Sequence, residues 1–240
     1  MTQAITFDFH NTLISCDPWF ELEVRTLCGS FLSWQSVGGV DPALKGEADR
    51  RYRVLRQAII EHGNERTAEE CVRAVLGEMG LAIRDDDIAH GVEAIMMATL
   101  ADAAPIPGAL GVVQELAAAN YALAIVSSAV YHPFLDVALE KFGFAGVFQS
   151  VVTSASSGFY KSRPEIYWAA LDQIGVRPEH AVHVGDSYRF DVLGAKRAGL
   201  ATVWLSDDPE AKLKSPAPDA VVASLIGASP AIRATLPRRL

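Results

Sequence analysis

Three aspartates stand in sequence contexts that could support chemistry. Asp8 lies in Phe7-Asp8-Phe9, at the end of an apolar segment, and Asp186 and Asp191 follow the turn residue Gly185. A carboxylate at the end of a buried strand is unfavourable unless it is paired or bound to a cation. A structural interpretation is also available, in which Asp8 caps a turn, Asp186 caps a helix and Asp191 favours the positive end of that helix. This structural interpretation explains either Asp186 or Asp191 well, but it explains the presence of both less well.

Together, these carboxylates predict a magnesium site. Carboxylates that meet above one sheet repel one another unless a divalent cation neutralises them. Mg²⁺ takes hard oxygen ligands, few of them from the protein, while waters and a substrate phosphate complete its octahedron. Phosphate transfer is therefore a natural function for a site built from Asp8, Asp186 and Asp191.

A lysine and two serines complete the candidate site. The ammonium of Lys161 could offset the charge on Asp8 and on a transferring phosphoryl group, although a lone loop lysine is more commonly solvated. Ser127 and Ser128 follow an apolar strand pattern, where a hydroxyl and the next backbone N–H groups could hold phosphate oxygens. The alternative for a single strand-end serine is an ordinary turn residue.

The elements that must position these residues alternate between strand and helix patterns. Strands are predicted at 4–9, 121–127, 147–153, 181–185 and 201–205, with one more at 219–222; helices are predicted at 109–119, 134–142, 164–174 and 187–198. Apolar strands separated by amphipathic helices indicate an α/β fold with a Rossmann-like parallel sheet covered on both faces. Ligands bind beyond the carboxyl ends of such strands, where Asp8, Ser127, Ser128 and Asp186 lie.

Residues 17–104 have a different character. They contain helical patterns, for example at 47–61 and 68–79, and few strand signals. Gly38-Gly39 and His62-Gly63-Asn64 break the helices, and Pro105-Ile106-Pro107-Gly108 closes the segment. The chain is therefore predicted to carry an all-helical insert after its first strand.

The overall composition restricts the possible partners. The chain has 240 residues, with 21 Lys and Arg against 29 Asp and Glu and a net charge of −8, which argues against non-specific nucleic-acid binding. It shows no secretory signal pattern and no apolar run of the ~20 residues that a membrane span needs. The scattered Cys16, Cys28 and Cys71 have no metal-type spacing and favour a reduced, cytoplasmic location.

In combination, these motifs resemble those of the haloacid dehalogenase-like hydrolase superfamily. The first motif matches at Asp8, Thr12 and Leu13, the second at Ser127 and the third at Lys161. The fourth motif matches at Gly185, Asp186 and Asp191, followed by Gly194-Ala195 and Ala198-Gly199. The motifs occur in order along nearly the whole chain, which makes the combination far more specific than any one of them. The resemblance implies a Rossmann-like core formed by 1–14 and 105–240, with a helical cap at 15–104.

The resemblance also implies roles for these residues. Asp8 would attack phosphorus to form an aspartyl-phosphate that water then hydrolyses. Asp8, Asp186 and the backbone carbonyl of His10 would ligate Mg²⁺, while Asp191 would order metal-bound waters or Lys161. Ser127 and Lys161 would hold the phosphoryl oxygens. The expected substrate is a small molecule, most naturally an anionic one, and the sequence does not indicate an oligomeric state.

Two departures from the family pattern leave alternatives open. Phosphatases of the family carry an acid–base aspartate two residues after the nucleophile, where this chain has His10. Histidine can do this work, because its unperturbed pKa is about 6.5, or it can merely fill the space. Asn11 replaces the usual glycine but tolerates left-handed geometry. Ser162-Arg163 separates Lys161 from Pro164, which predicts a loop difference and not the loss of the lysine.

Three functions therefore compete. A magnesium-dependent phosphatase fits Asp186 and Asp191 best. A metal-free 2-haloacid dehalogenase fits His10, because dehalogenases of the superfamily carry an aromatic residue there. A binding protein with a degraded site has only the missing aspartate in its favour. In the insert, Arg50, Arg51, Arg53 and Arg56 could meet an anionic group but more often form a solvated face, and Trp19, Phe20 and Trp34 are predicted to be core. His180 and His183 are predicted to be structural.

Overall fold

A parallel sheet forms the centre of the larger lobe. The computed structural model describes residues 2–36, 38–208 and 210–237. The strand order is β5-β4-β1-β6-β7-β8, and all neighbouring pairs are parallel. The strands are β1 Ala4–Phe7, β4 Ala122–Ser127, β5 Ser150–Thr153, β6 Ala181–Gly185, β7 Ala201–Leu205 and β8 Ala220–Val222. The chain winds outward from β1 in both directions, so the carboxyl ends of β1, β4 and β6 lie side by side at the point where the winding reverses. The predicted α/β class is confirmed.

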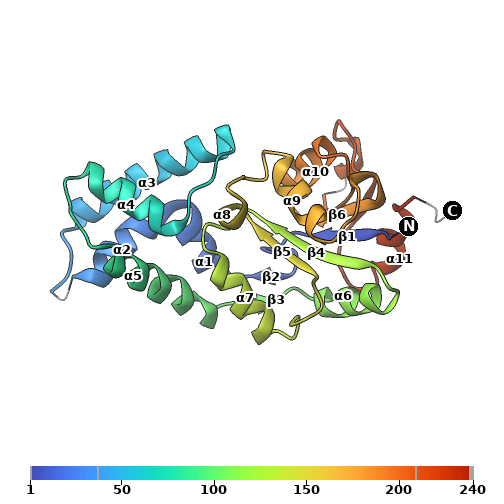
Figure 1. Cartoon of the computed structure of the whole chain (residues 1–240), viewed down its shortest axis with the longest axis horizontal. Coiled ribbons are helices and arrows are strands. Elements are labelled where there is room, and N and C mark those ends of the chain that lie inside the picture. The colour runs from blue at the N-terminus through green and yellow to red at the C-terminus, as the bar shows by residue number, and fades with distance from the viewer. Residues whose placement is uncertain (1, 37, 209, 238–240) are drawn as a thin grey trace.

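Helices cover both faces of this sheet, as Figure 1 shows. Along β4, Leu123 and Ile125 face the larger hydrophobic cluster, while Ala122, Ala124 and Val126 face a second cluster that contains α9. The helices of this lobe are α6 Ala109–Ala118, α7 His132–Lys141, α8 Ser154–Ser157, α9 Glu165–Gln173, α10 Leu193–Arg197 and α11 Ser229–Ala234, with short 3-10 turns η3 Pro178–His180 and η5 Ala211–Leu213. Both faces of the sheet are covered by these helices, which explains why the strands of the sheet are continuous apolar runs in the sequence.

The predicted strand and helix positions agree with the structure to within a few residues at their ends. The strand predicted at 4–9 ends at Phe7, and the strand predicted at 147–153 begins at Ser150. The helix predicted at 187–198 is divided into a π-helical turn, η4 Tyr188–Val192, and α10. A π-turn inside a helix frequently marks a functional site, and this one carries Asp191.

The second lobe is helical. The two segments that connect it to the sheet lobe pair with each other as short strands. The residues Ile14 and Ser15 (β2 Ile14–Ser15) pair antiparallel with Pro105 and Ala104 (β3 Ala104–Pro105), so the chain leaves and re-enters the sheet lobe at one place. The intervening elements are α1 Asp17–Glu21, η1 Leu22–Thr26, α2 Leu27–Gln35, α3 Pro42–His62, α4 Ala68–Glu78, α5 Asp85–Ala98 and η2 Thr99–Ala101. Figure 1 shows α2, α3, α4 and α5 gathered at one end of the molecule.

Local capping fixes the limits of these helices. Asp41 caps α3 by accepting a hydrogen bond from the Ala43 N–H, and the helix ends at Gly63 in a left-handed conformation. Thr67 and Glu70 form a reciprocal capping box at the start of α4. Within the described ranges, no helix combines the length and apolar character needed to cross a bilayer.

The loop between α3 and α4 rests directly on the sheet lobe. The Glu65 N–H donates to the Gly158 carbonyl at 2.8 Å, and the Tyr160 N–H donates to the Gly63 carbonyl at 2.9 Å. Asn64 and Phe159 form a single antiparallel bridge between these contacts. The helical lobe is thus held next to the loop that carries Lys161, and a cavity lies between them.

Candidate active site

Asp8 is fixed at the carboxyl end of the central strand. Its N–H donates to the Val184 carbonyl at 2.8 Å, and the Thr12 hydroxyl donates to its Oδ2 at 3.2 Å. Asn11 has a φ of 59°, so the turn after Asp8 uses the left-handed geometry that asparagine tolerates. This turn points the Asp8 carboxylate into the cavity.

Lys161 joins Asp8 to Asp191 in a buried group of charges. Its Nζ donates to Asp8 Oδ1 and, at 2.8 Å, to Asp191 Oδ1. All three side chains are buried. Buried charges that are paired and hydrogen-bonded avoid most of the penalty of desolvation. The extra residues between Lys161 and Pro164 therefore do not displace the ammonium from Asp8.

Asp191 is held from several sides. Its Oδ2 accepts from the Ser187 N–H at 2.8 Å, and its Oδ1 lies 3.1 Å from His183 Nε2. The other His183 nitrogen, Nδ1, lies 2.8 Å from the Thr6 hydroxyl. Burial alone would raise the pKa of Asp191, but the Lys161 ammonium and the His183 hydrogen bond outweigh it and hold the pKa well below its usual range. Asp191 is thus a permanent anion next to Lys161.

Gly185 allows this arrangement. A Cβ at this position would lie 2.3 Å from Asp191 Cγ, which is closer than any real contact. The glycine in the fourth motif is therefore required for close approach of the Asp191 carboxylate, beyond the turn that the sequence indicated.

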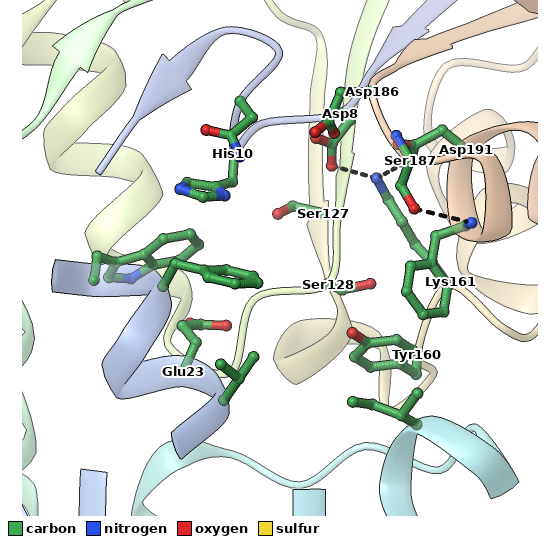
Figure 2. A pocket seen from close by; sticks show the side chains of 16 residues that line it. Asp8, His10, Glu23, Ser127, Ser128, Tyr160, Lys161, Asp186, Ser187 and Asp191 are labelled. Carbon is green, nitrogen blue, oxygen red and sulfur yellow. Dashed lines mark hydrogen bonds and ion pairs between the residues drawn. The ribbon is translucent and has the colours of Figure 1, made fainter. Parts of the chain in front are cut away.

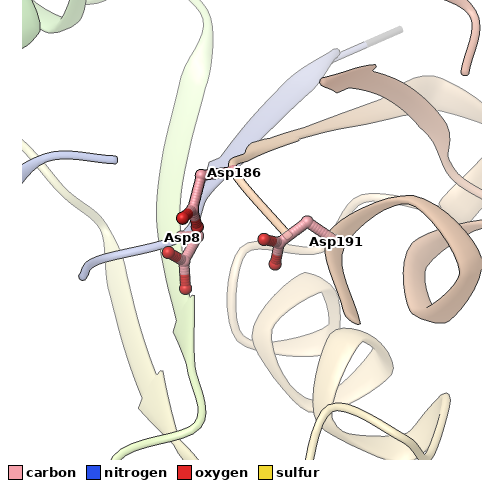
Figure 3. A group of neighbouring side chains, drawn as sticks. All are labelled: Asp8, Asp186 and Asp191. Atoms are coloured by element: carbon pink, nitrogen blue, oxygen red, sulfur yellow. The ribbon is translucent and has the colours of Figure 1, made fainter. Parts of the chain in front are cut away.

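Asp186 brings a third carboxylate to the same point. Ligand oxygens of Asp8, Asp186 and Asp191 all lie within 4.8 Å of one another. Figure 3 shows the three side chains. Burial, then the charges of Asp8 and Asp191, raises the pKa of Asp186 to about 8 against the pull of Lys161. Burial raises the pKa of Asp8 to about 6, although Lys161 lowers it. Three carboxylates against one ammonium leave an excess of negative charge. A divalent cation with oxygen ligands would neutralise it, so these residues fit Mg²⁺.

The serines line the cavity from the neighbouring strand. Ser127 is the last residue of β4 and is buried, and Ser128 follows it with its hydroxyl near that of Tyr160. Figure 2 shows Ser127 between His10 and the Asp8–Lys161 group, with Ser128 further along the wall. The structure thus places Ser127 and Ser128 in one cavity with Asp8, His10, Lys161, Asp186 and Asp191.

His10 is turned toward the helical lobe. Its ring stacks on Phe20, with centroids 4.9 Å apart and an interplanar angle of 4°, and lies 5.6 Å from Trp19. Among the described residues, no partner hydrogen-bonds to its buried Nε2. Burial lowers the pKa of His10, although Asp17 and the Cys16 backbone pull it upward. The imidazole is therefore mostly neutral at pH 7.

The cavity has a volume of about 340 Å³ and two unlike walls. One wall is the strand-end group of charges. The other comes largely from the helical lobe and is apolar except for the carboxyl group of Glu23 (Figure 2). Its lining side chains are Trp19, Phe20, Glu23, Val24 and Ile60. Glu23 and Val24 lie on the π-turn η1, so each wall carries one π-helical turn.

Some expectations for the helical lobe need correction. Phe20 is 42% exposed and lines the cavity, and Trp34 is 44% exposed, so neither is core. The core prediction for Trp19 is confirmed, although its side chain also lines the cavity. Helical spacing alone cannot distinguish a buried face from a cavity wall or an exposed face.

The arginines of α3 do not reach the described cavity lining. Arg50 and Arg51 pair with Glu47 on the surface, and Arg56 pairs with Glu65 in the interior. The solvated face was the better interpretation for Arg50 and Arg51. Arg56 differs because its guanidinium is buried beside the loop that rests on the sheet lobe.

One lining residue that matters for the cavity was not identified from the sequence. His183, which was assigned a structural role, is buried outside the lining and holds Asp191. Glu23 was not singled out, because one glutamate within a helical pattern carries no distinguishing signal. Its burial depends on the tertiary packing of η1 against the loop after β4.

The comparisons with known proteins agree with this geometry. The sequence matches the haloacid dehalogenase-like hydrolase family over residues 2–199. It is 26% identical over 210 residues to the glyceraldehyde 3-phosphate phosphatase of Methanothermobacter thermautotrophicus, covering 87% of each chain. Among solved structures, a HAD phosphatase from Thermococcus onnurineus has a TM-score of 0.64 at 21% identity, covering 98% of this chain and 99% of that one. A 2-haloacid dehalogenase from Pseudomonas syringae has a TM-score of 0.70 at 20% identity, with the same coverage. At these identities the solved structures establish the fold alone.

Proposed function

Because the chain belongs to the haloacid dehalogenase-like hydrolase family, we propose that it is a magnesium-dependent phosphatase for a small phosphorylated metabolite. The observation that carries this proposal is the buried group in which Lys161 pairs with both Asp8 and Asp191, next to Asp186. Relatives named as glyceraldehyde 3-phosphate phosphatases support phosphate-ester chemistry.

In the first step, an Asp8 oxygen forms a bond to phosphorus while the bond from phosphorus to the leaving oxygen breaks. The product is an aspartyl-phosphate and an alcohol, once the leaving oxygen has gained a proton. Lys161 contacts Asp8, so its ammonium is in place to balance charge on the phosphoryl oxygens. Ser127 and Ser128, at the end of β4, would donate to the same oxygens.

In the second step, water adds to the phosphorus, the bond to Asp8 breaks and inorganic phosphate leaves. His10 occupies the position for proton transfer, giving a proton to the leaving oxygen first and taking one from the water later. Because burial lowers its pKa, His10 suits the second task better than the first. Leaving groups that need no proton should therefore react fastest.

The carboxylate cluster is where the metal would bind. Asp8 and Asp186 would be direct ligands together with the His10 carbonyl, and Asp191 would order metal-bound waters or Lys161. When bound, Mg²⁺ would supply positive charge next to the phosphoryl group.

The helical insert would serve as a cap on the core. We place the cap at 15–104 and the core at 1–14 and 105–240, since β2 and β3 bring both crossings together. A cap that closes the cavity excludes water during the reaction and contacts the leaving group.

The experiment that tests the proposal measures phosphate release from small phosphate esters and acyl phosphates, with Mg²⁺ and with EDTA. Wild-type protein should turn over in Mg²⁺ and stop in EDTA. Asp8→Asn should lose at least about 10⁴-fold in kcat, because it removes the nucleophile. Asp172→Asn, on the exposed side of α9, is the matched control and should retain full activity. Release of phosphate by Asp8→Asn at the wild-type rate would overturn the assignment.

One observation favours a second candidate. His10 packs against Phe20 and Trp19, and the cavity wall beyond it is apolar, which would suit a carbon–halogen bond. In that reaction an Asp8 oxygen would displace halide from carbon, and water would hydrolyse the resulting ester. Chloride release from 2-chloropropionate that persists in EDTA, with no phosphate release from the ester panel, would favour this function.

A further inference from the structure

Glu23 is the one carboxyl group that the helical lobe contributes to the described lining of the cavity. It is only 2% exposed and lies at the opposite end of the cavity from Asp8 (Figure 2). Around it, the wall consists of Phe20, Val24 and Ile60. A buried carboxyl group in an apolar wall is unfavourable for stability unless its oxygens find partners.

The position of Glu23 is fixed, but its hydrogen-bonding capacity is not filled. Its two oxygens accept from the Val130 N–H at 3.0 and 3.1 Å, and the next backbone N–H, that of Tyr131, also interacts with the carboxyl group. The Tyr52 hydroxyl donates to the Glu23 backbone carbonyl at 2.7 Å and fixes the π-turn. A protonated carboxyl group has one O–H donor besides its acceptor sites, and no bond of this donor is seen among the described residues, so capacity remains for a ligand in the cavity.

No basic side chain pairs with Glu23 in the described part of the chain. The neighbouring Arg56 pairs with Glu65. Lys161, the one lysine or arginine in the described lining, pairs with Asp8 and Asp191 at the other end. His10 is mostly neutral at pH 7, as burial lowers its pKa. A second anionic group on a substrate would therefore be buried beside Glu23 without a countercharge.

The protonation of Glu23 suits a hydroxyl partner. Burial raises its pKa to about 8, although Arg56 lowers it. The carboxyl group therefore carries a proton over much of the neutral range, and it can donate one hydrogen bond and accept others. A hydroxyl group likewise has one donor and two acceptor sites, so it can both accept from and donate to the protonated carboxyl group.

We propose that Glu23 determines leaving-group specificity, so that the site accepts phosphate monoesters with an uncharged, hydroxyl-bearing leaving group and rejects those with a second anionic group. This inference rests on the proposed phosphatase function. The volume of about 340 Å³ is at the small end of the ~300–1,000 Å³ typical of ligand pockets, which favours a short sugar or polyol phosphate.

The test uses two substrates that differ in one group. D-glyceraldehyde 3-phosphate and 3-phosphoglycerate share the phosphate ester and the neighbouring hydroxyl, but the second carries a carboxylate where the first has an aldehyde. Both leaving oxygens are primary alkoxides, so the demand for a proton is the same. We expect kcat/KM to be at least 30-fold higher for the aldehyde.

Two variants assign the preference to Glu23. Glu23→Leu removes the polar group and should raise KM for D-glyceraldehyde 3-phosphate about tenfold, with a smaller change in kcat. Glu23→Gln keeps a donor and an acceptor and should stay within threefold of wild type. Glu61→Gln, an exposed change on α3, is the control for altering charge on the cap.

Acetyl phosphate separates the possible failures. If wild type releases no phosphate from acetyl phosphate or from either ester, the phosphatase function is overturned, and this inference with it. If acetyl phosphate is hydrolysed but 3-phosphoglycerate is cleaved as well as the aldehyde, the inference alone is overturned. If Glu23→Leu slows all three substrates equally, Glu23 has only a structural role. If Glu23→Leu does not fold, Glu23→Gln and the substrate pair still decide the matter.

Discussion

The two walls of the cavity stabilise their buried carboxyl groups in different ways. On the sheet side, Lys161 pairs with Asp8 and Asp191, and Asp191 is also held by His183 and the Ser187 N–H. On the helical side, Glu23 accepts from backbone N–H groups without a paired base. Pairing with Lys161 therefore keeps Asp191 charged on the sheet side, whereas the unpaired carboxyl group on the helical side is kept neutral.

Under the proposed function, the sheet-side wall would carry out the reaction and the helical wall would recognise the leaving group. The charged wall is attached to the ends of β1, β4 and β6, whose parallel pairing fixes the relative positions of Asp8, Ser127 and Asp186. The apolar wall is attached to α1, η1 and α3, in an insert joined to the sheet lobe at β2 and β3. A change in the insert can alter which molecule fits without moving the reacting groups.

The largest expected effect comes from removing the charge at the centre of the sheet-side wall. Lys161→Met leaves Asp8 and Asp191 buried without their countercharge. We expect kcat to fall by at least about 10³-fold, and the free energy of unfolding to fall by about 3–5 kcal/mol. Thermal unfolding and phosphate release measure the two effects.

Lys196→Met provides the contrast. Lys196 pairs with Asp219 at 2.8 Å near the surface, where the median ion pair contributes about 0–1 kcal/mol. This variant should unfold close to the wild-type temperature and keep its activity. Equal destabilisation by Lys161→Met and Lys196→Met would contradict the view that the sheet-side wall depends on its pairing.

The sheet-side wall was largely predictable from sequence, for a physical reason. Asp8, Ser127 and Asp186 lie at the ends of predicted strands and Lys161 lies in the loop after the third, and parallel strands bring their carboxyl ends to one edge. Asp191 is one helical turn further on, and the motif spacing was enough to place it at the same edge.

The helical wall was not predictable in the same way. Helical periodicity indicates which face is apolar, but not whether that face packs against protein or against a cavity. Phe20 and Glu23 lie in the cavity because η1 packs against the loop after β4, and that contact joins residues more than 100 positions apart. The π-turn that sets the direction of Glu23 has no sequence signature of its own.

A moderate effect is expected where the two walls meet, at His10. Phosphatases of the family pattern carry an aspartate at this position as the acid for the leaving oxygen, whereas this chain has the buried imidazole of His10. We expect His10→Asp to raise kcat on alkyl phosphate esters by about 10- to 100-fold, within the ~10²–10⁴-fold range of general acid catalysis.

The same variant should change hydrolysis of acetyl phosphate less than threefold, since that leaving group needs no proton. The ratio of the two rates is the measurement, because it cancels differences in the amount of active protein. A similar gain on both substrates would show that His10 acts through packing against Phe20 and not through proton transfer.

The smallest effect tests the neutral state of the Glu23 carboxyl group through stability. The pKa of Glu23 rises from 4.5 to about 8 on folding. As the pH is raised, the unfolded chain therefore loses this proton at a lower pH than the folded chain does. The stability contributed by the neutral group is complete below pH 4.5 and is lost as pH rises through 8.

Glu23→Gln stays neutral and lacks this dependence. Between pH 5.5 and 8.5, we therefore expect wild type to lose more in Tm than Glu23→Gln. Asp8 and Asp186 titrate in the same range, but they are present in both proteins and cancel in the difference. Parallel Tm curves for wild type and Glu23→Gln would mean that Glu23 is ionised in the folded chain, and that both walls of the cavity carry charge.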